Sequence, residues 1–475
     1  MRSRTPESTE NGPGSSALTV VPPALPLPTA PIGGPATGVS IDTRTLQPGD
    51  LFVAIKGDTH DGHDHIARAF EAGAVAALVS RAVGGGPLFV VEDSLRGMER
   101  LGVAARARSG ARLLAITGSV GKTSAKEMAR VALSALGPTH ASAASFNNHW
   151  GVPLTLARLP ADAAYGVFEI GMNHAGEITP LVGFVRPHVA LVTTIGPVHI
   201  EHFGSLEGIA DAKAEIFSGV EPGGAAVLNR DAPQFERLAA AARARGLRII
   251  DFGATGAARL LACEPHGEGS RIEAEIGGER VSFTLGAPGR HMAENAVGVL
   301  AALQALGAPL RACAEALAAF APAKGRGERF TLSAPGGDIT LIDESYNANP
   351  VSMRAALALL GAAKPGPGGR RIAVIGDMLE LGEQGAALHA ALAADLQANG
   401  VDLLFGAGPL TRALYEATPA SSRAAYAETS EELRAPLIAA LRAGDVVMIK
   451  GSNGSRMGPL AAALRDHFSP RARGV

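Results

Sequence analysis

A lysine and a threonine follow a tight glycine turn near residue 120, and their spacing is typical of a phosphate-binding loop. The stretch is Leu113-Leu-Ala-Ile-Thr-Gly-Ser-Val-Gly-Lys-Thr-Ser124. Glycines let backbone N–H groups curl around a phosphate, and the positive end of a helix dipole adds to the attraction. The Lys122 ammonium can reach the β- and γ-phosphates of a nucleotide, and the Thr123 hydroxyl is placed to ligate Mg²⁺.

This loop is a short variant, because the full phosphate-loop pattern has a glycine where this chain has Ile116. The apolar run before the turn predicts a strand, and the residues after it predict a helix. An ordinary strand-to-helix connection is the alternative interpretation. The candidate phosphate-binding residues are Gly118, Ser119, Gly121, Lys122, Thr123 and Ser124.

Three further polar residues are predicted to meet at one edge of a sheet. Glu169 lies in the strand-like run 167–170, His199 follows the run 189–194, and Lys213 lies on a later helical segment. Ligands of open α/β sheets bind beyond the carboxyl ends of the strands. Singly, each residue is weak evidence, because a buried Glu is usually a paired core carboxylate and a lone loop His is usually structural.

The elements that would position these residues alternate between strands and helices, which predicts an α/β fold with a mostly parallel, doubly wound sheet. Residues 291–321 predict helices, and 321–328 predicts a hinge. A second, Rossmann-like α/β sheet is predicted beyond the hinge, without a Gly-x-Gly-x-x-Gly fingerprint. Its expected strands are 339–343, 371–376, 402–406 and 446–450.

A small N-terminal α/β domain is expected before the phosphate loop. Apolar runs at 51–55 and 74–79 predict strands, a helix is expected after Asp61, and Gly73 is its predicted stop. A cluster of histidines in this region suggests either a metal site or, as we favour, polar surface residues: His60, His63 and His65. The expected divisions are a disordered Pro/Gly/Ser-rich tail at 1–36, then domains at 37–110, 111–322 and 323–475.

Composition excludes several classes of function. The 475 residues are 47% apolar and 19% charged with a net charge of −2, so no electrostatic footprint for nucleic acid or an anionic membrane exists. No run of about 18 apolar residues predicts a membrane span. Cys263 and Cys313 lack metal-type spacing, and prolines interrupt any secretory signal. We therefore expect a soluble cytoplasmic protein.

Eight motif blocks occur in an order that resembles the ATP-dependent Mur ligase family of peptidoglycan synthesis, from about residue 37 to the C-terminus. They are Thr117–Ser124, Asn147–Thr155, Glu169–Ile178, His199–Ser205, Ala212–Phe217, Gly289–Asn295, Gly325–Arg326 and Asp343–Pro350.

The resemblance is strongest to the branch of the family that adds D-alanyl-D-alanine. This branch is indicated by the blocks Ser40–Arg44, Pro48–His63, Ser345–Pro350 and Gly376–Gly382 followed by His389. The Asp-Asn-Pro-Arg motif expected of the diaminopimelate-adding branch does not occur in the sequence. The resemblance implies three domains: a UDP-substrate domain, a central ATP-binding domain and a C-terminal ligase domain.

The resemblance implies a ligase that joins UDP-N-acetylmuramoyl-tripeptide to D-alanyl-D-alanine through an acyl phosphate, releasing ADP and phosphate. The implied nucleotide site includes the phosphate loop with Asn295, Arg326 and Asp343. The implied ligands of two Mg²⁺ ions are Thr123, Glu169, His199 and Lys213, with Lys213 carbamylated. A plain lysine that forms a salt bridge with Asp211 or Glu215 is the alternative for Lys213.

The same resemblance implies the substrate-binding residues, which are Ser40, Thr43, Arg44, Asn148, Asn347 and Asn349. Lys122, His199 and Lys213 would be catalytic, and closure across the hinge would complete the site. An Asn-rich turn without a ligand is the alternative for Asn347 and Asn349. We expect a monomer.

Three other functions remain open. One is a sibling enzyme that adds a different amino acid, and another is a folylpolyglutamate-type ligase, against which the block 38–63 argues. The third is a nucleotide-binding regulator that forms no bond, although such a protein would be expected to have lost a metal ligand.

Overall fold

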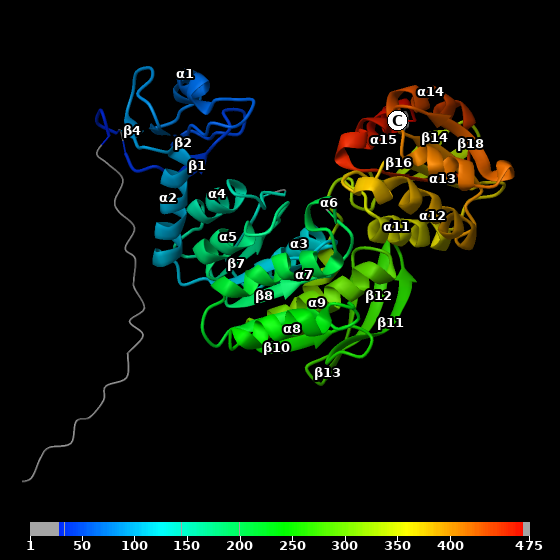
Figure 1. The fold of residues 1–475 in the computed structure, drawn as a ribbon, viewed down its shortest axis with the longest axis horizontal. Helices are drawn as coiled ribbons and strands as arrows, with labels where there is room; N and C mark the ends of the chain where they lie inside the picture. The colour runs from blue at the N-terminus through cyan, green and yellow to red at the C-terminus, as the bar shows by residue number, and fades with distance from the viewer. Residues whose placement is uncertain (1–27, 33, 144, 199, 469–475) are drawn as a thin grey trace, which may run out of the picture. The chain divides into compact units, whose positions relative to one another are not determined.

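The computed structural model describes residues 28–32, 34–143, 145–198 and 200–468 (Figure 1). Its contacts divide the chain into two compact units, with the boundary between Ala104 and Ala105. The predicted tail falls mostly on residues 1–27, which lie outside the described residues. In its described part, the Thr29 backbone N–H donates to the Leu88 carbonyl at 2.8 Å, and the Thr29 hydroxyl accepts from the Leu88 N–H at 3.0 Å.

The N-terminal unit contains a four-stranded parallel sheet in the order β1-β2-β3-β4. The predicted strands and the helix after Asp61 are confirmed, and Gly73 ends that helix with a φ of +98°. The strands are β1 (Gly38–Ser40), β2 (Asp50–Val53), β3 (Ala76–Val79) and β4 (Leu88–Val90). The helices are η1 (Gly62–His65), α1 (Ile66–Glu71) and α2 (Ser94–Arg108), which crosses the boundary.

The central part of the second unit is a nine-stranded sheet in the order β13-β12-β11-β10-β9-β8-β5-β7-β6. Strands from β10 to β6 are parallel as predicted, and β11 to β13 add antiparallel pairings that the sequence analysis did not predict. The strands are β5 (Arg112–Thr117), β6 (Thr139–Ala141), β7 (Tyr165–Glu169), β8 (Val189–Val192), β9 (Ala225–Asn229), β10 (Arg248–Phe252), β11 (Ala258–His266), β12 (Gly269–Ile276) and β13 (Glu279–Leu285).

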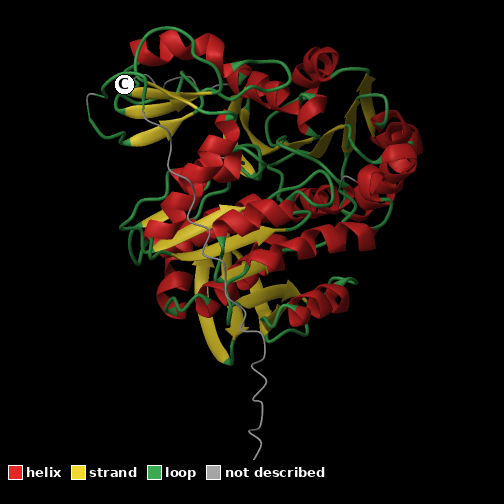
Figure 2. Ribbon diagram, turned by 60° about the vertical axis from the view of Figure 1, so that its left-hand side comes forward, coloured by secondary structure: helices red, strands yellow, loops and turns green. Residues whose placement is uncertain are grey.

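Helices cover both faces of this sheet (Figure 2), because successive strand residues point to opposite sides. Leu114 and Ile116 pack with α3, α9 and α10, whereas Leu113 and Ala115 pack with α4, α5, α7 and α8. The helices are α3 (Lys122–Ser134), α4 (Gly151–Ala157), α5 (Ile178–Val185), α6 (Ile200–Phe203), α7 (Leu206–Ala214), η2 (Glu215–Gly219), α8 (Phe235–Ala244), α9 (Arg290–Ala305), α10 (Leu310–Ala316) and η3 (Leu317–Ala319).

The C-terminal part, coloured yellow to red in Figure 1, is a six-stranded sheet in the order β14-β15-β19-β16-β17-β18. Its four predicted strands are confirmed, while β14 and β18 were not predicted. The strands are β14 (Glu328–Ala334), β15 (Gly337–Glu344), β16 (Arg371–Gly376), β17 (Leu403–Ala407), β18 (Arg423–Ala427) and β19 (Val446–Lys450). The helices are α11 (Pro350–Ala362), η4 (Gly382–Gln384), α12 (Gly385–Ala398), α13 (Thr411–Ala417), η5 (Ala420–Ser422), α14 (Ser430–Ala440), η6 (Asn453–Ser455) and α15 (Met457–His467).

Candidate active site

The phosphate loop joins β5 to α3, and its glycines are required by the backbone. Gly118 has a φ of +144°, and a Cβ there would lie 2.0 Å from the Thr193 hydroxyl oxygen. Gly121 has a φ of +86° and immediately precedes α3. Side chains at such positive φ values are strained, so glycine is the residue that fits. The loop therefore has the local structure that the sequence predicts.

The Lys122 ammonium lies against the loop backbone, where Nζ donates to the Gly118 carbonyl at 2.7 Å. Burial lowers the pKa of Lys122; the Glu169 carboxylate opposes this effect, and the Arg326 guanidinium adds to it. The Ser119 hydroxyl donates to the Gly196 carbonyl at 3.0 Å and accepts from the Gly196 N–H at 3.0 Å. These bonds fix the loop against the segment that follows β8.

Glu169 presents a buried carboxylate directly beside the Thr123 hydroxyl. Thr123 Oγ1 donates to Glu169 Oε2 at 3.0 Å, and Asn147 Nδ2 donates to Glu169 Oε1 at 2.7 Å. Glu169 is 1% exposed. A hydroxyl and a carboxylate are the hard oxygen donors that Mg²⁺ prefers, so this pair fits the ion.

Lys213 lies on α7 and is 3% exposed. Burial lowers its pKa well below the usual range for lysine, and the nearby Lys122 ammonium lowers it further. The two predicted salt-bridge partners are bonded elsewhere: Asp211 binds Arg237, and Glu215 accepts from the N–H groups of Gly176 and Thr179. Among the described residues, Lys213 forms no ion pair. His199, its predicted companion, lies outside the described residues.

One cavity of about 510 Å³ brings residues of both sheets of the second unit together. From the central part it is lined by the phosphate loop, Glu169 and Asn295, and from the C-terminal part by Arg326 and α11 residues. Asn295 Nδ2 donates to the Gly121 carbonyl at 3.2 Å, which attaches α9 to the loop. The predicted site residues on its wall are Ser119, Gly121, Lys122, Thr123, Ser124, Glu169, Asn295, Arg326, Asn347 and Asn349.

Arg326 and Asp343 mark a second, adjoining cavity of about 630 Å³. The Arg326 guanidinium lies 4.1 Å from the centre of the Tyr346 ring, in a cation–π contact. Asp343 is 2% exposed, and its Oδ1 accepts from the Ser345 hydroxyl at 2.6 Å. Arg326 lines both cavities, whereas Asp343 lines only the second.

The predicted substrate residues differ in what they contact. Ser40 is fully buried, and its hydroxyl donates to the Asp42 carbonyl within its own turn. Arg44 is exposed and pairs with the Asp42 carboxylate at 2.6 Å, and Thr43 is half-buried on the same turn. Asn148 does not line the cavity; its Oδ1 accepts from the Gly151 N–H at the start of α4, while its neighbour Asn147 holds Glu169.

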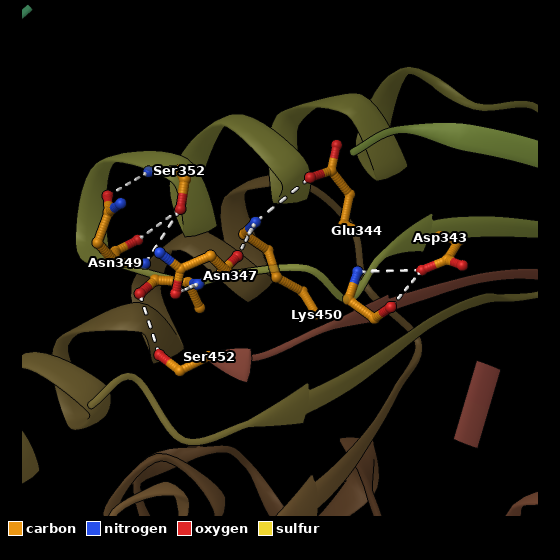
Figure 3. A network of polar contacts seen from close by, with 9 residues as sticks. Asp343, Glu344, Asn347, Asn349, Ser352, Lys450 and Ser452 are labelled. Carbon is orange, nitrogen blue, oxygen red and sulfur yellow. Dashed lines mark hydrogen bonds and ion pairs between the residues drawn. The ribbon is translucent and has the colours of Figure 1, made fainter. Parts of the chain in front are cut away.

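The Asn-rich turn after β15 is part of a polar network (Figure 3). Asn349 caps α11 by accepting from the Ser352 N–H at 2.9 Å, and it also lines the cavity. The Asn347 carbonyl accepts from Lys450 Nζ at 2.9 Å. Lys450 and its partner Glu344 also line the cavity, although neither was predicted as a site residue. Their positions could have indicated this, because Lys450 ends the predicted strand 446–450 and Glu344 directly follows the predicted strand 339–343. Ligands of open α/β sheets bind at such strand ends.

The histidine cluster of the N-terminal unit requires a correction. His63 is 5% exposed, with Nδ1 2.6 Å from Asp61 Oδ1 and Nε2 accepting from the Ser80 N–H at 2.9 Å. The expectation of a surface residue was therefore wrong for His63, which is a hydrogen-bonded core histidine. No group of His, Cys, Asp and Glu suited to a metal ion occurs among the described residues.

Comparison with known proteins gives family matches along the chain. Residues 35–118 match the Mur ligase family, catalytic domain; residues 116–303 match the Mur ligase middle domain; residues 325–453 match the Mur ligase, glutamate ligase domain. UDP-N-acetylmuramoyl-tripeptide–D-alanyl-D-alanine ligase from Escherichia coli (strain K12) is 36% identical over 437 residues, covering 90% of this chain and 94% of the relative.

Solved structures of enzymes from the same family are similar to this chain over most of its length. The crystal structure of MurF from Acinetobacter baumannii has a TM-score of 0.80 at 30% identity, covering 91% of this chain and 94% of that chain. MurF ligase from Thermotoga maritima in complex with ADP has a TM-score of 0.77 at 25% identity, covering 92% of this chain and 99% of that chain.

Within the described ranges, no helix is long and apolar enough to cross a bilayer.

The three family matches follow one another in the order of the structural parts described above. The identity to the Escherichia coli relative exceeds 30% over nine-tenths of the chain. This chain belongs to the Mur ligase family, in its group of UDP-N-acetylmuramoyl-tripeptide–D-alanyl-D-alanine ligases.

Proposed function

We propose that this protein is an ATP-dependent ligase that joins UDP-N-acetylmuramoyl-tripeptide to D-alanyl-D-alanine and releases ADP and phosphate. One observation carries the proposal: Lys122, Thr123 and Glu169 of the central part line the same cavity as Arg326 of the C-terminal part. The relatives that bear this enzyme name support the choice of substrates. The ADP complex of the Thermotoga maritima enzyme supports the nucleotide.

The chemistry proceeds in two displacements. A carboxylate oxygen of the tripeptide attacks the γ-phosphorus of ATP. The bond between the γ-phosphorus and the oxygen that bridges the β- and γ-phosphates breaks, and ADP leaves. The dipeptide amine then attacks the acyl carbon, the bond to the phosphate oxygen breaks, and the nitrogen loses a proton. Since the first step brings anions together, charge neutralisation and alignment are the main tasks of the protein.

Lys122 and Arg326 supply the positive charge for this step. Lys122 extends from the start of α3, where the helix dipole and the loop N–H groups also favour phosphate. Arg326 is held over the Tyr346 ring, whose hydroxyl donates to Ser145 Oγ at 2.9 Å. This contact orients a guanidinium from the C-terminal part against the phosphate end of the cavity.

Mg²⁺ is part of the proposal, and Thr123 and Glu169 would hold it. Bound there, the ion would offset charge on the β- and γ-phosphates. Asn147 orients the Glu169 carboxylate through its 2.7 Å hydrogen bond. A second ion, with His199 and a carbamylated Lys213 as ligands, completes the set that the family resemblance implies.

The carbamate on Lys213 would form when its neutral amine attacks CO₂ and loses a proton, which leaves a carboxylate on nitrogen. Burial without a counter-ion favours the neutral amine that this reaction requires. Asp211 already forms an ion pair with Arg237, which supports the carbamate over a salt bridge between Lys213 and Asp211.

The remaining assignments follow from the same proposal. Asn295 and Asp343 would contact the nucleotide, and Thr43 and Arg44 of the N-terminal unit would contact the UDP part of the donor. Ser40, which is fully buried, would support their turn through its hydrogen bonds to the Asp42 backbone. Arg44 can pair with a diphosphate in bidentate fashion, in exchange for Asp42. We propose that the protein acts in the cytoplasm, because ATP and a UDP-linked precursor are its substrates. The monomeric state stays a prediction.

The test is ATP-dependent phosphate release with UDP-N-acetylmuramoyl-tripeptide, with and without D-alanyl-D-alanine. Release that requires both substrates and yields the pentapeptide product is expected. Turnover with a single amino acid in place of the dipeptide would indicate the sibling enzyme. ATP binding without turnover of any precursor would indicate a regulator.

A further inference from the structure

Buried Lys450 and partly buried Glu344 form an ion pair on the cavity wall, and the chemistry described above uses neither of them. Lys450 Nζ lies 3.3 Å from Glu344 Oε2 and donates to the Asn347 carbonyl at 2.9 Å (Figure 3). The two residues are register partners at the ends of the parallel strands β15 and β19. The carboxyl ends of such strands are where ligands bind in open α/β sheets, so the pair stands in a ligand-binding position.

Lys122 and Lys450 belong to different parts of the second unit and contact different groups. Lys122 Nζ donates to the Gly118 carbonyl of the phosphate loop, whereas Lys450 Nζ lies 3.3 Å from Glu344 Oε2 at the ends of β19 and β15. At the phosphate loop, Lys122 and Arg326 provide the cations that the proposed function assigns to phosphate.

The ammonium of Lys450 retains capacity for a further acceptor. A lysine ammonium has three N–H donors, and the described residues provide two partners, Glu344 and Asn347. The 3.3 Å distance to Glu344 exceeds the usual 2.7–2.9 Å of a charge-assisted bond. A ligand carboxylate can therefore accept the third hydrogen bond of the Lys450 ammonium, which Glu344 holds in place.

We propose that Lys450 binds the C-terminal carboxylate of the incoming dipeptide, and that Glu344 positions the ammonium for it. This inference rests on the proposed function. The dipeptide amine must remain free to attack the acyl carbon, so its carboxylate is the end that the protein can hold by charge. The two residues of an extended dipeptide span at most about 7 Å. The reacting amine would therefore lie within about that distance of the carboxylate held by Lys450.

The test compares D-alanyl-D-alanine with D-alanyl-D-alaninamide, which lacks the carboxylate. The wild-type kcat/KM is expected to favour the acid by about 10²-fold, because the amide leaves a buried charge without its ligand. Lys450→Met is expected to lower kcat/KM for the acid by the same factor through KM, and to bring the ratio of acid to amide near one. Lys364→Met, an exposed lysine outside the cavity, is the matched control and should retain the wild-type ratio.

Lys450→Met leaves the partly buried Glu344 carboxylate without its cation, so the double variant Lys450→Met/Glu344→Gln is measured beside it. The double variant should also lose the preference for the acid. A wild-type ratio in either variant, or a loss that falls on the KM of ATP or of the UDP-linked donor, would overturn the inference. Wild-type protein that uses acid and amide equally would overturn it while leaving the proposed function intact. No turnover with the dipeptide would overturn both.

Discussion

Lys213 in the central part and Lys450 in the C-terminal part are both almost fully buried, yet their surroundings differ. Lys450 has a carboxylate at 3.3 Å and a carbonyl at 2.9 Å. Lys213 has no ion-pair partner among the described residues, and burial holds its pKa well below the usual range. Burial of an unpaired amine disfavours its charge, whereas a counter-ion favours it. The same residue type therefore suits a neutral nucleophilic amine in one place and an anion-binding cation in the other.

The largest effect that tests this comparison is expected at Lys213. Lys213→Ala should lower kcat by about 10²- to 10³-fold, because it removes a charged group that the transition state requires. Short carboxylic acids added to the assay should restore part of the activity by replacing the carbamate. Lys364→Ala serves as the control. Full activity of Lys213→Ala, or failure of every short acid to restore it, would contradict the carbamate.

The carboxylate beside the phosphate loop gives the next effect. Asn147→Ala should raise the Mg²⁺ concentration needed for half-maximal activity by about 10- to 100-fold, because Asn147 orients the Glu169 carboxylate that we propose as a Mg²⁺ ligand. Asn148→Ala is the matched control, since the Asn148 side chain accepts from the Gly151 N–H and does not contact Glu169. Magnesium titrations of both variants distinguish the two asparagines, and equal shifts would contradict the assignment.

Removal of the counter-ion of Lys450 should have a smaller effect. Glu344→Gln is expected to raise the KM for D-alanyl-D-alanine about tenfold with kcat nearly unchanged, because it removes one charged partner from the ammonium. Glu383→Gln, at an exposed glutamate of η4, is the control. Steady-state kinetics with varied dipeptide check this prediction, and a fall in kcat alone would argue against positioning.

The smallest effect concerns the turn that holds Lys450. Asn349→Ala should destabilise the C-terminal part by about 1 kcal/mol, because it removes the cap of α11. Asn349→Ser, which retains a capping oxygen, should keep most of the stability. Denaturant midpoints followed by circular dichroism measure both variants, and identical midpoints for wild type and Asn349→Ala would show that the cap contributes nothing.

The predictions from sequence succeeded where the signal is local. The phosphate loop, strands such as β8, β16 and β19, and the stop at Gly73 follow from apolar runs and glycine turns that neighbouring residues define. The antiparallel strands β11 to β13 were missed. Their inward-facing apolar residues alternate with polar ones, and their pairing partners are chosen by contacts within the sheet.

Single side chains show the same limit. Asn147 and Asn148 are adjacent and identical in type, and only the backbone path decides which one faces Glu169. His63 lies in a polar stretch, yet its bonds to Asp61 and Ser80 bury it. Neither choice is visible in composition or spacing, because both depend on contacts with distant segments.

By itself, the sequence determined the phosphate loop and the two α/β sheets, and it supplied the candidate residues for nucleotide and metal, since these depend on local spacing and periodicity. Tertiary structure decided how the buried lysines differ. The partners of Lys450 lie about a hundred residues away in the chain, and the predicted partners of Lys213 are bonded to other segments. The charge state of a buried lysine depends on which groups folding brings beside it, and that follows from the packing of the sheets.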